Sequence, residues 1–493
     1  MNKMPPYLLL LACASSAVAQ ANRAPNILFI VSDDQRPDTV HALGNTYIDT
    51  PHLDRLVTRG STFTRAIAAN PVCISSRSEI LTGATGFRNG ASPFGAVMKP
   101  EMAFLGDVLR KAGYITWYSG KWMNDGSPKT RGYDETSALY VSGETGRTIK
   151  ATYPKAYNGV EVTGYGDWVF KSNNGKTESE KGIGLTPITD RHIADGAIAL
   201  IQRRPDRPFF LHVNFTAPHD PRHFPPGYEK KYDPAAIPLP PNFLTEHPFD
   251  HGNAGQRDEK LLPVPRNPDE VKAEIAAYYA LISHMDEQIG RIVEALRATG
   301  QEQNTIIIFT SDQGLAIGSH GLLGKQNMYE HTIGVPLILA GPGIPQNRRF
   351  AAQTYLRDMF PTLCDMVGAP IPKSVEGRSL VPVLKGSVKE IYPEVYAYWH
   401  ISSGRSAKMA AETGSPVELP IERMVRTDRW KLIHYSHLQR YQLFDLVNDP
   451  HELKDLSAVS EHQGIKADLQ RKLRDWFAPR IAPYNQAAGR AKL

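Results

Sequence analysis

The sequence predicts an α/β protein with a large mixed, mostly parallel sheet between layers of helices, followed by a smaller C-terminal α+β domain. Two apolar runs of strand length, at residues 27–31 and 306–309, contain no polar residue, and an aspartate follows each run within three positions. Uninterrupted apolar strands are typical of parallel sheets that helices cover on both faces. After about residue 385 the chain changes to short strand-like pieces, which indicates the second domain.

The larger domain is predicted to span residues 20–385. Besides the two apolar runs, we expect strands at 114–118, 209–215 and 335–340 and helices at 102–111 and 355–367. Another helix precedes the second run, because apolar residues recur at spacings of three and four between Ile282 and Leu296, and Gly300 ends the pattern. This alternation of strands and helices predicts a doubly wound sheet.

The C-terminal domain is predicted to cover residues 386–493. Its expected elements are strands at 395–399, 431–435 and 441–446 and a helix at 465–477. Within the larger domain, the stretch from about 221 to 268 is rich in proline and has no periodicity. A stretch of this length fits a surface excursion beside a site better than it fits a linker.

Length and composition exclude several classes of protein. The chain has 493 residues, of which 41% are hydrophobic and 22% charged, as in folded proteins and unlike disordered, collagenous or coiled-coil chains. The net charge of +5 is too small to indicate nucleic-acid binding, although it suits an anionic substrate. No apolar stretch of 18 residues follows the first 20 residues, so we expect no membrane-spanning segment.

The beginning of the chain is typical of an export signal, predicted at residues 1–19. Lys3 precedes an apolar core at 7–14, and small residues at 17–19 provide a cleavage site before Gln20. Residues 10–13 also resemble a bacterial lipoprotein box, which would leave Cys13 lipidated and the protein tethered. We therefore expect a secreted or periplasmic protein, or alternatively one that is lipid-anchored at the cell surface.

Acidic residues follow the two apolar strands and predict a metal site. Asp33 and Asp34 come after the first run, and Asp312 and Gln313 come after the second. Parallel strands end at one edge of a sheet, and carboxylates gathered there need a cation. Oxygen ligands favour Ca²⁺ or Mg²⁺ over zinc, and we predict Ca²⁺. The alternative is that each aspartate is only a turn former or a helix cap, and the presence of two clusters favours the metal site over it.

The segment at 71–83, PVCISSRSEILTG, resembles the signature of the type I, formylglycine-dependent sulfatases of the alkaline phosphatase superfamily. Other segments recur in the order of that family, and the likeness covers nearly the whole mature chain: SGKW at 119–122, APHDP at 217–221, SDQG at 311–314 and GKQNMYE at 324–330. The resemblance implies an alkaline-phosphatase-like fold and an arylsulfatase-like, secreted sulfatase.

The resemblance also implies roles for individual residues. A formylglycine-generating enzyme would convert Cys73 to formylglycine, whose hydrated form attacks the sulfur of a sulfate ester. The metal ligands would be Asp33, Asp34, Cys73, Asp312 and Gln313. Arg77 lies four residues after Cys73, on the same helix face, and would hold the nucleophile and the sulfate. Lys121 and Lys325 would supply positive charge, and His219 would protonate the leaving oxygen.

Two positions depart from the family pattern. Ser75 stands where the family usually has proline or alanine, and Met123 stands where it usually has histidine. Cys73 and Arg77 keep their spacing, so we still expect conversion of Cys73. Without the histidine, Lys121 is the only catalytic group that the resemblance implies in this segment. The absence of the imidazole predicts a slower turnover or the transfer of one step to another group.

We expect the substrate to be a sulfated carbohydrate, although the sequence names neither the sugar nor the sulfated position. The predicted substrate-binding residues are Arg222, His223, His400 and Arg405. A phosphonate or phosphodiester hydrolase of the same superfamily remains an alternative, as does a weakly active binder of sulfated glycans. A phosphatase with a serine or threonine nucleophile and zinc is disfavoured by Cys73.

Overall fold

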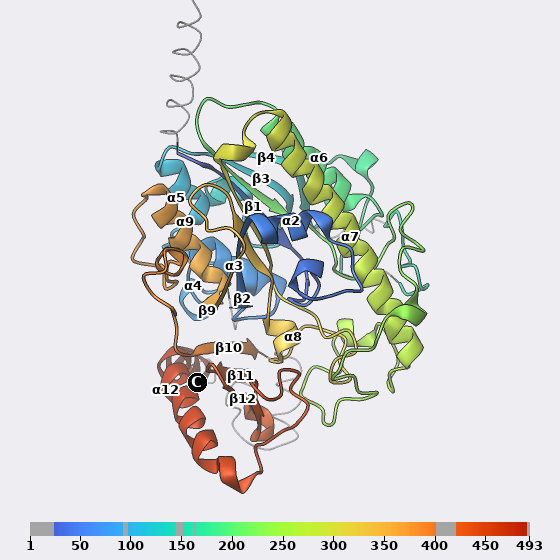
Figure 1. Ribbon diagram of the computed structural model, residues 1–493, viewed down its shortest axis with the longest axis vertical. Coiled ribbons are helices and arrows are strands. Elements are labelled where there is room, and N and C mark those ends of the chain that lie inside the picture. The colour runs from blue at the N-terminus through green and yellow to red at the C-terminus, as the bar shows by residue number, and fades with distance from the viewer. Residues whose placement is uncertain (1–23, 92–96, 144–150, 162–163, 401–420, 491–493) are drawn as a thin grey trace, which may run out of the picture.

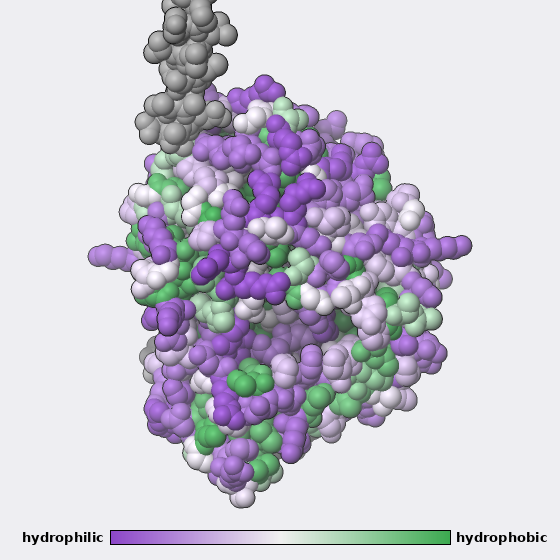
Figure 2. Space-filling model, viewed as in Figure 1, coloured by the Kyte–Doolittle hydropathy of each residue, from purple (hydrophilic) through white to green (hydrophobic). Residues whose placement is uncertain are grey.

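The computed structural model describes residues 24–91, 97–143, 151–161, 164–400 and 421–490. The predicted signal peptide, Cys13 and Arg405 lie outside these ranges. A large body contains the main sheet with helices on both sides, and a smaller C-terminal unit lies at one end of this body (Figure 1). Within the described ranges, no helix is long and apolar enough to cross a membrane. Figure 2 shows that polar residues dominate one face of the molecule, with apolar residues in scattered patches.

The main sheet has nine strands in the order β5-β4-β3-β6-β1-β7-β8-β2-β9. β1 lies near the centre and is parallel to both of its neighbours, β6 and β7. Two strands run in the opposite direction: β8 is antiparallel to β7 and β2, and β5 is antiparallel to β4. The strands are β1 (Asn26–Ser32), β2 (Gly60–Ile67), β3 (Ile115–Lys121), β4 (Glu135–Val141), β5 (Val169–Lys171), β6 (Phe209–Asn214), β7 (Thr305–Ser311), β8 (Leu337–Ala340) and β9 (Arg348–Tyr355). The prediction of a mixed, mostly parallel sheet is confirmed.

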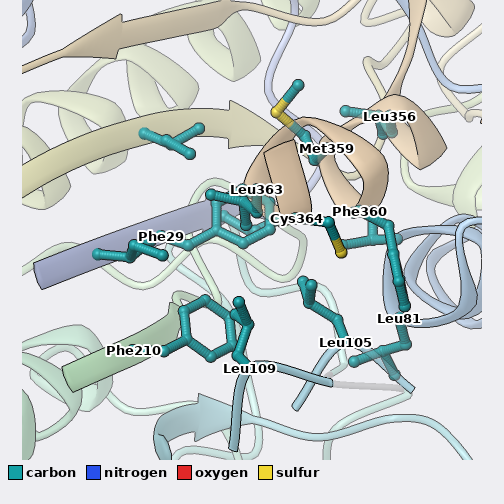
Figure 3. Packing of buried hydrophobic residues seen from close by; sticks show 14 of the residues in the cluster. Phe29, Leu81, Leu105, Leu109, Phe210, Leu356, Met359, Phe360, Leu363 and Cys364 are labelled. Carbon is teal, nitrogen blue, oxygen red and sulfur yellow. The ribbon is translucent and has the colours of Figure 1, made fainter. Parts of the chain in front are cut away.

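Helices cover both faces of this sheet because its central strands are apolar on both sides. In β1, Phe29 faces one hydrophobic cluster and its neighbour Ile30 faces the other. The first face is covered by α3 (Cys73–Thr82), α5 (Leu105–Lys111) and α9 (Met359–Val367), and the second by α2 (Pro51–Arg59), α6 (Thr189–Ile201) and α7 (Pro268–Ala298). Figure 3 shows Phe29 and Phe210 of the sheet beneath Leu363 of α9.

The C-terminal unit is an antiparallel sheet with a long helix on one face. Its strands pair in the order β10 (Val395–His400), β11 (Ile421–Arg426), β12 (Trp430–Tyr435) and β13 (Arg440–Asp445). Leu469, Leu473 and Phe477 of α12 (Gln463–Arg490) pack on one face of this sheet. Met424 and Ile433 on the opposite face pack against Met328 and Tyr329 of the main body. The predicted α+β character is confirmed.

Several predicted boundaries were wrong. The helix predicted at 355–367 begins at Met359, because Tyr355 still pairs with Ile67 in the sheet and its backbone N–H donates to the carboxylate of Asp358. The helix predicted at 102–111 begins at Leu105, after an extended Phe104. The strand predicted at 335–340 begins at Leu337, after Pro336, which has no N–H to donate.

The proline-rich stretch contains little regular structure, as expected. Between residues 221 and 267 it forms only two short 3₁₀ helices, η4 (Pro234–Ala236) and η5 (Asp258–Lys260). It ends at Asn267, whose side chain accepts hydrogen bonds from the backbone of Asp269 and Glu270 and so caps α7. The remaining short helices are η1 (His41–Leu43), α4 (Gly86–Asn89), η2 (Pro128–Arg131), η3 (Ser179–Lys181), η6 (Glu302–Asn304), α8 (Glu330–Ile333), η7 (Leu356–Asp358), α10 (Val381–Leu384), η8 (Ser436–Leu438) and η9 (Ser460–His462).

Candidate active site

The carboxyl ends of β1 and β7 bring four polar side chains together. The register pairs Ser32 with Ser311, so the residues that follow each strand are neighbours. The backbone N–H of Asp34 donates to Oδ1 of Asp312 at 3.1 Å, and Nε2 of Gln313 donates to Oδ1 of Asp34 at 2.6 Å. Asp34 has a φ of 68°, a left-handed conformation that aspartate tolerates better than most residues. The two acidic clusters therefore meet, as expected.

The thiol of Cys73 lies directly against this cluster. Cys73 is the first residue of α3, and its Sγ donates to Oδ1 of Asp33 at 3.3 Å. The thiol also accepts from Nε2 of Gln313 at 3.1 Å and from Nζ of Lys325 at 3.3 Å. Only 2% of Cys73 is exposed, and this burial raises the pKa of the thiol well above its usual value. Unmodified Cys73 is therefore a neutral thiol and a poor nucleophile.

Arg77 lies one helical turn after Cys73 and binds two of the carboxylates. Its Nε donates to Oδ2 of Asp312 at 2.9 Å, and its Nη2 lies 3.8 Å from Oδ2 of Asp33. Its Nη1 donates to the side-chain oxygen of Asn214, at the end of β6. The guanidinium therefore connects the ends of three strands beneath the thiol.

Lys121 reaches the cluster from the end of β3. Its Nζ forms a buried ion pair with Oδ2 of Asp33. The pairing of β3 with β4 shifts register between Ser119 and Gly120, an irregularity that redirects the next side chain. Gly120 has a φ of 99°, and a Cβ there would lie 2.0 Å from the carbonyl oxygen of Asn214. Glycine is therefore required for β3 to approach β6 at this point.

Lys325 and His219 form a hydrogen-bonded pair next to the thiol. Nζ of Lys325 lies 2.8 Å from Oδ2 of Asp34 and 2.9 Å from Nε2 of His219. Nδ1 of His219 contacts the backbone carbonyl oxygen of Asp220 and lies 3.3 Å from its carboxylate. Burial and the charge of Lys325 lower the pKa of His219 well below its usual value. The imidazole is therefore neutral, with its proton on Nδ1 and its Nε2 lone pair facing Lys325.

The group of side chains fits a hard divalent cation. Asp33, Asp34, Cys73 and His219 each place a ligand atom within 4.8 Å of the others. Within the described residues, Oε1 of Gln313 is buried without a hydrogen-bond partner, so this amide has an oxygen to offer. Both oxygens of Asp312 already accept hydrogen bonds, from Arg77 and from backbone N–H groups. Carboxylate and amide oxygens are the ligands that Ca²⁺ and Mg²⁺ prefer.

The pKa values of the two aspartates after β1 differ sharply. Burial alone would raise the pKa of Asp33, but the positive charges of Lys121 and Arg77 hold it well below its usual value. Burial raises the pKa of Asp34 to about 7, with Lys325 opposing the rise and Asp33 adding to it. A protein without a cation here would therefore keep Asp34 partly protonated near neutral pH, and a bound cation would replace that proton.

The predicted substrate-binding residues that the structure describes lie in different environments. Arg222 forms a buried ion pair with Glu274, so its charge is neutralised. His223 lines the same small cavity as His219. His400 ends β10 in the C-terminal unit and is partly buried, which lowers its pKa to about 4.

Sequence reasoning missed several residues that contact the site. The hydroxyl of Tyr165 donates to Oδ2 of Asp33 at 3.0 Å, and the edge of its ring meets the ring of His219 with centroids 4.7 Å apart. Nη1 of Arg257, from the proline-rich stretch, lies 2.8 Å from the carboxylate of Asp220. Asp220 could have been suspected from its place beside His219. Tyr165 lies in a segment without periodicity and gave no signal.

The two departures from the family pattern have different surroundings. Ser75 is buried in the first turn of α3, and its carbonyl oxygen accepts from the hydroxyl of Ser78 at 2.7 Å. Met123 is partly buried and packs against the hydrophobic cluster that contains Tyr140, Tyr165 and Trp168. Met123 thus contributes apolar packing beside the site and no hydrogen-bonding side chain.

Two family models match the chain. The sulfatase model matches residues 25–369, and the model of the C-terminal part of N-sulphoglucosamine sulphohydrolase matches residues 318–478. The first match contains every catalytic and metal-binding residue predicted above.

Curated relatives resemble the chain over nearly its whole length. An arylsulfatase from Clostridium perfringens is 30% identical, with 91% of this chain and 93% of the relative covered. An N-acetylglucosamine-6-O-sulfatase from Bacteroides thetaiotaomicron is 27% identical, with 96% and 91% covered. A multifunctional alkaline phosphatase superfamily protein from Trinickia caryophylli is 25% identical, with 92% and 95% covered.

Solved structures share the fold. A protein solved with its substrate D-glucosamine-2-N,6-O-disulfate superimposes with a TM-score of 0.74 at 23% identity, covering 93% of this chain and 99% of the other. A phosphonate monoester hydrolase of Agrobacterium radiobacter gives a TM-score of 0.74 at 22% identity, covering 92% and 96%. The same architecture thus occurs in proteins that act on sulfate and on phosphonate groups.

Proposed function

The chain belongs to the sulfatase family and is a sulfuric ester hydrolase, and from this premise we propose that it removes sulfate from a sulfated saccharide with formylglycine made from Cys73 and one bound Ca²⁺. The observation that carries the proposal is the position of Cys73. Its buried thiol contacts Asp33, Gln313 and Lys325 at the meeting point of two strand ends. A cysteine that served only packing would not be surrounded by ionised side chains.

The balance of charge suits an anionic group. Arg77, Lys121 and Lys325 carry three positive charges, and the carboxylates of Asp33, Asp34 and Asp312 carry three negative charges when all are ionised. A divalent cation would therefore leave an excess of two positive charges. This excess would attract a sulfate group and stabilise the charge that develops on its oxygens.

The side chains of this chain have separate tasks in such a reaction. When present, hydrated formylglycine supplies a nucleophilic hydroxyl and the cation lowers the pKa of that hydroxyl. Arg77 fixes the carboxylates beneath position 73. Lys325 contacts the thiol of Cys73 and Lys121 binds Asp33 beside it, and both would neutralise sulfate oxygens.

His219 and Lys325 are the proposed source of the proton that the leaving alcohol needs. Asp220 holds the proton of His219 on Nδ1, so Nε2 is the nitrogen that exchanges a proton with Lys325. The Arg257–Asp220 ion pair fixes the carboxylate that orients the imidazole. A proton on this pair can pass to an oxygen that departs beside position 73.

The names of the relatives support a saccharide substrate. One acts on N-acetylglucosamine 6-O-sulfate, and a structural neighbour was solved with a sulfated glucosamine. The neighbours that hydrolyse phosphonates favour a second candidate activity, since the same charged site would also attract a phosphonate or phosphodiester. We propose export by the predicted signal at 1–19, which would bring the protein to extracellular glycans.

The first test is made on protein co-expressed with a formylglycine-generating enzyme. Peptide mass analysis should find position 73 about 18 Da lighter than cysteine, as conversion of the thiol to an aldehyde requires. Cys73→Ala should abolish hydrolysis of an aryl sulfate. Cys364→Ala is the matched control, because Cys364 is equally buried but packs in a hydrophobic cluster away from the site. Activity in protein that retains the thiol would refute the proposal.

The second test identifies the metal and shows whether the enzyme prefers sulfate or phosphonate substrates. Chelation should remove activity, and Ca²⁺ should restore it better than Zn²⁺. Rates on an aryl sulfate, an aryl phosphonate and N-acetylglucosamine 6-sulfate should then be compared with one preparation. Faster hydrolysis of the phosphonate than of both sulfates would select the second candidate.

A further inference from the structure

A second cavity lies at the same edge of the main sheet, outside the catalytic cluster. It encloses about 370 Å³, within the range of small-ligand pockets. Its walls come from the loop after η1, the proline-rich stretch and α7, with Asn45, Tyr47, Pro238, Pro241 and Tyr279 among the lining residues. None of the residues assigned above to catalysis or metal binding lines this cavity.

Tyr278 separates the cavity from the metal site. Its hydroxyl donates to the backbone oxygen of Asp34 at 2.5 Å and accepts from the backbone N–H of Arg36 at 2.9 Å. The ring of Tyr278 forms part of the cavity wall. A ligand in the cavity would therefore lie on the far side of this side chain from Asp34.

One wall of the cavity offers an apolar face to a flat ring. Tyr47 is 48% exposed, and the exposed Pro238 and Pro241 line the same cavity as the tyrosines of α7. Tyr47 owes its position to Asn45, whose side-chain oxygen accepts from the Tyr47 backbone N–H at 3.0 Å. Tyrosine in this setting combines an apolar face with a hydroxyl that can hydrogen-bond.

The polar groups of the cavity do not suit an anion. Arg36 is its only lysine or arginine, and that guanidinium is already used by Asp38 at 2.7 Å, by the carbonyl oxygen of Ala316 at 2.9 Å and by the hydroxyl of Ser319 at 3.1 Å. The side chain of Asp38 is 59% exposed. The Arg36–Asp38 pair therefore leaves no net charge to attract sulfate, while the exposed carboxylate oxygens of Asp38 can still accept hydrogen bonds from hydroxyl groups.

We propose that this cavity binds an uncharged saccharide unit, stacked on Tyr47 and hydrogen-bonded to Asp38. The apolar wall matches the C–H face of a sugar ring, and the carboxylate matches its hydroxyl groups. The inference rests on the proposed function in one respect: the unit would belong to the glycan whose sulfate is removed at Cys73. The cavity would then hold an unsulfated part of the chain while the sulfated unit occupies the catalytic site.

The test uses chitotetraose as an uncharged probe and N-acetylglucosamine 6-sulfate as a charged one. Saturation-transfer NMR on Cys73→Ala protein should detect chitotetraose, and adding Tyr47→Phe should preserve the signal because the ring is kept. Adding Tyr47→Ala should weaken chitotetraose binding at least about fivefold, as for loss of a central aromatic contact. Binding of the 6-sulfate should be the same with either Tyr47 variant.

Kinetics provide an independent arm of the test. In otherwise wild-type enzyme, Tyr47→Ala should leave kcat/KM for a small aryl sulfate unchanged and should raise KM for a sulfated oligosaccharide. Equal chitotetraose binding by Tyr47→Ala and Tyr47→Phe, or no binding to protein with Tyr47 intact, would overturn the inference. Failure of the proposed function would look different, because the wild-type enzyme would then hydrolyse no sulfate ester.

Discussion

Tyr165 shows how much of the site depends on one residue outside every motif. It is 1% exposed, its hydroxyl binds Asp33, its ring edge meets His219, and Nζ of Lys121 lies 5.1 Å from the ring centroid. One side chain thus fixes a proposed metal ligand, a proposed proton donor and a cation. Met123 packs in the cluster that holds this tyrosine in place.

Tyr165→Phe is predicted to weaken both metal binding and catalysis. The substitution keeps the ring and removes one buried hydrogen bond to a charged carboxylate, a loss of about 2 kcal/mol. We expect Ca²⁺ affinity, measured by calorimetry, to fall at least about tenfold, with a parallel fall in kcat. Tyr441→Phe is a control in the C-terminal unit and should change neither quantity. Unaltered Ca²⁺ affinity in Tyr165→Phe would show that Asp33 does not need the hydrogen bond from the Tyr165 hydroxyl to bind the cation.

Gln313 offers a second test with a single residue. Gln313→Leu keeps the approximate size of the side chain but removes the buried oxygen that has no partner, whereas Gln313→Asn keeps an amide oxygen on a shorter side chain. We expect the leucine variant to bind Ca²⁺ more weakly than the asparagine variant. The opposite order would indicate that Gln313 acts through its donation to Asp34 and Cys73 and not as a ligand.

At the scale of elements, α8 connects the proposed catalytic segment around Lys325 to the C-terminal sheet. Glu330 begins this helix, five residues after Lys325, and its carboxylate binds Nη1 of Arg426 at 2.5 Å and Nζ of Lys431 at 3.0 Å. Lys431 also binds Glu452 at 2.7 Å. An ion cluster therefore fixes the start of α8 against β11 and β12.

Glu330→Gln is predicted to destabilise the protein in a pH-dependent way. Burial alone would raise the pKa of Glu330, but Arg426 and Lys431 lower it to about 2 from the usual 4.5. The ionised group therefore contributes stability above pH 4.5, and this contribution is lost as the pH falls towards 2. We expect a loss of about 3 kcal/mol at pH 7 that shrinks as the pH falls from 4.5 towards 2 in denaturant titrations. Asp468→Asn, in an exposed pair, should have little effect.

The two strands that the sequence predicts most directly are those whose environment is uniform. β1 and β7 are buried along their whole length, so their sequences are continuously apolar. β9 was missed because its first four residues are exposed or half-buried and include two arginines. β11, IERMVR, was missed because its polar residues are buried by ion pairs such as Arg426–Glu330, which local patterns do not reveal.

The same reasoning explains what could be predicted of the site. Asp33, Asp34, Asp312 and Gln313 follow apolar strands, and parallel strands end at one edge, so their meeting was predictable. Tyr165 and Arg257 come from segments without periodicity, whose paths depend on packing of the whole chain. The substrate residues could not be located for the same reason.

At the scale of the molecule, the proposed metal site exists only in the folded state. Its residues come from the segments that follow β1 and β7 and from the start of α3, and the sequence separation between Cys73 and Gln313 is 240 residues. A ligand that binds the folded state alone stabilises it by mass action. We expect Ca²⁺ at 100 times its Kd to add about 2.7 kcal/mol, seen as a rise in melting temperature. The double variant with Asp33→Asn and Asp34→Asn should show no rise in melting temperature when Ca²⁺ is added.

The depth of Cys73 restricts when an enzyme can act on it. During synthesis the ribosome adds the 240 residues between Cys73 and Gln313 in roughly 10 to 50 seconds, at about 5–20 residues per second. Until β7 emerges, the central sheet is incomplete and the cysteine is accessible. Once the chain is complete, only 2% of Cys73 is exposed, and its thiol contacts Asp33, Gln313 and Lys325. The proposed conversion would therefore have to take place on the nascent or unfolded chain, and a molecule that folds first would keep its thiol for as long as it stays folded.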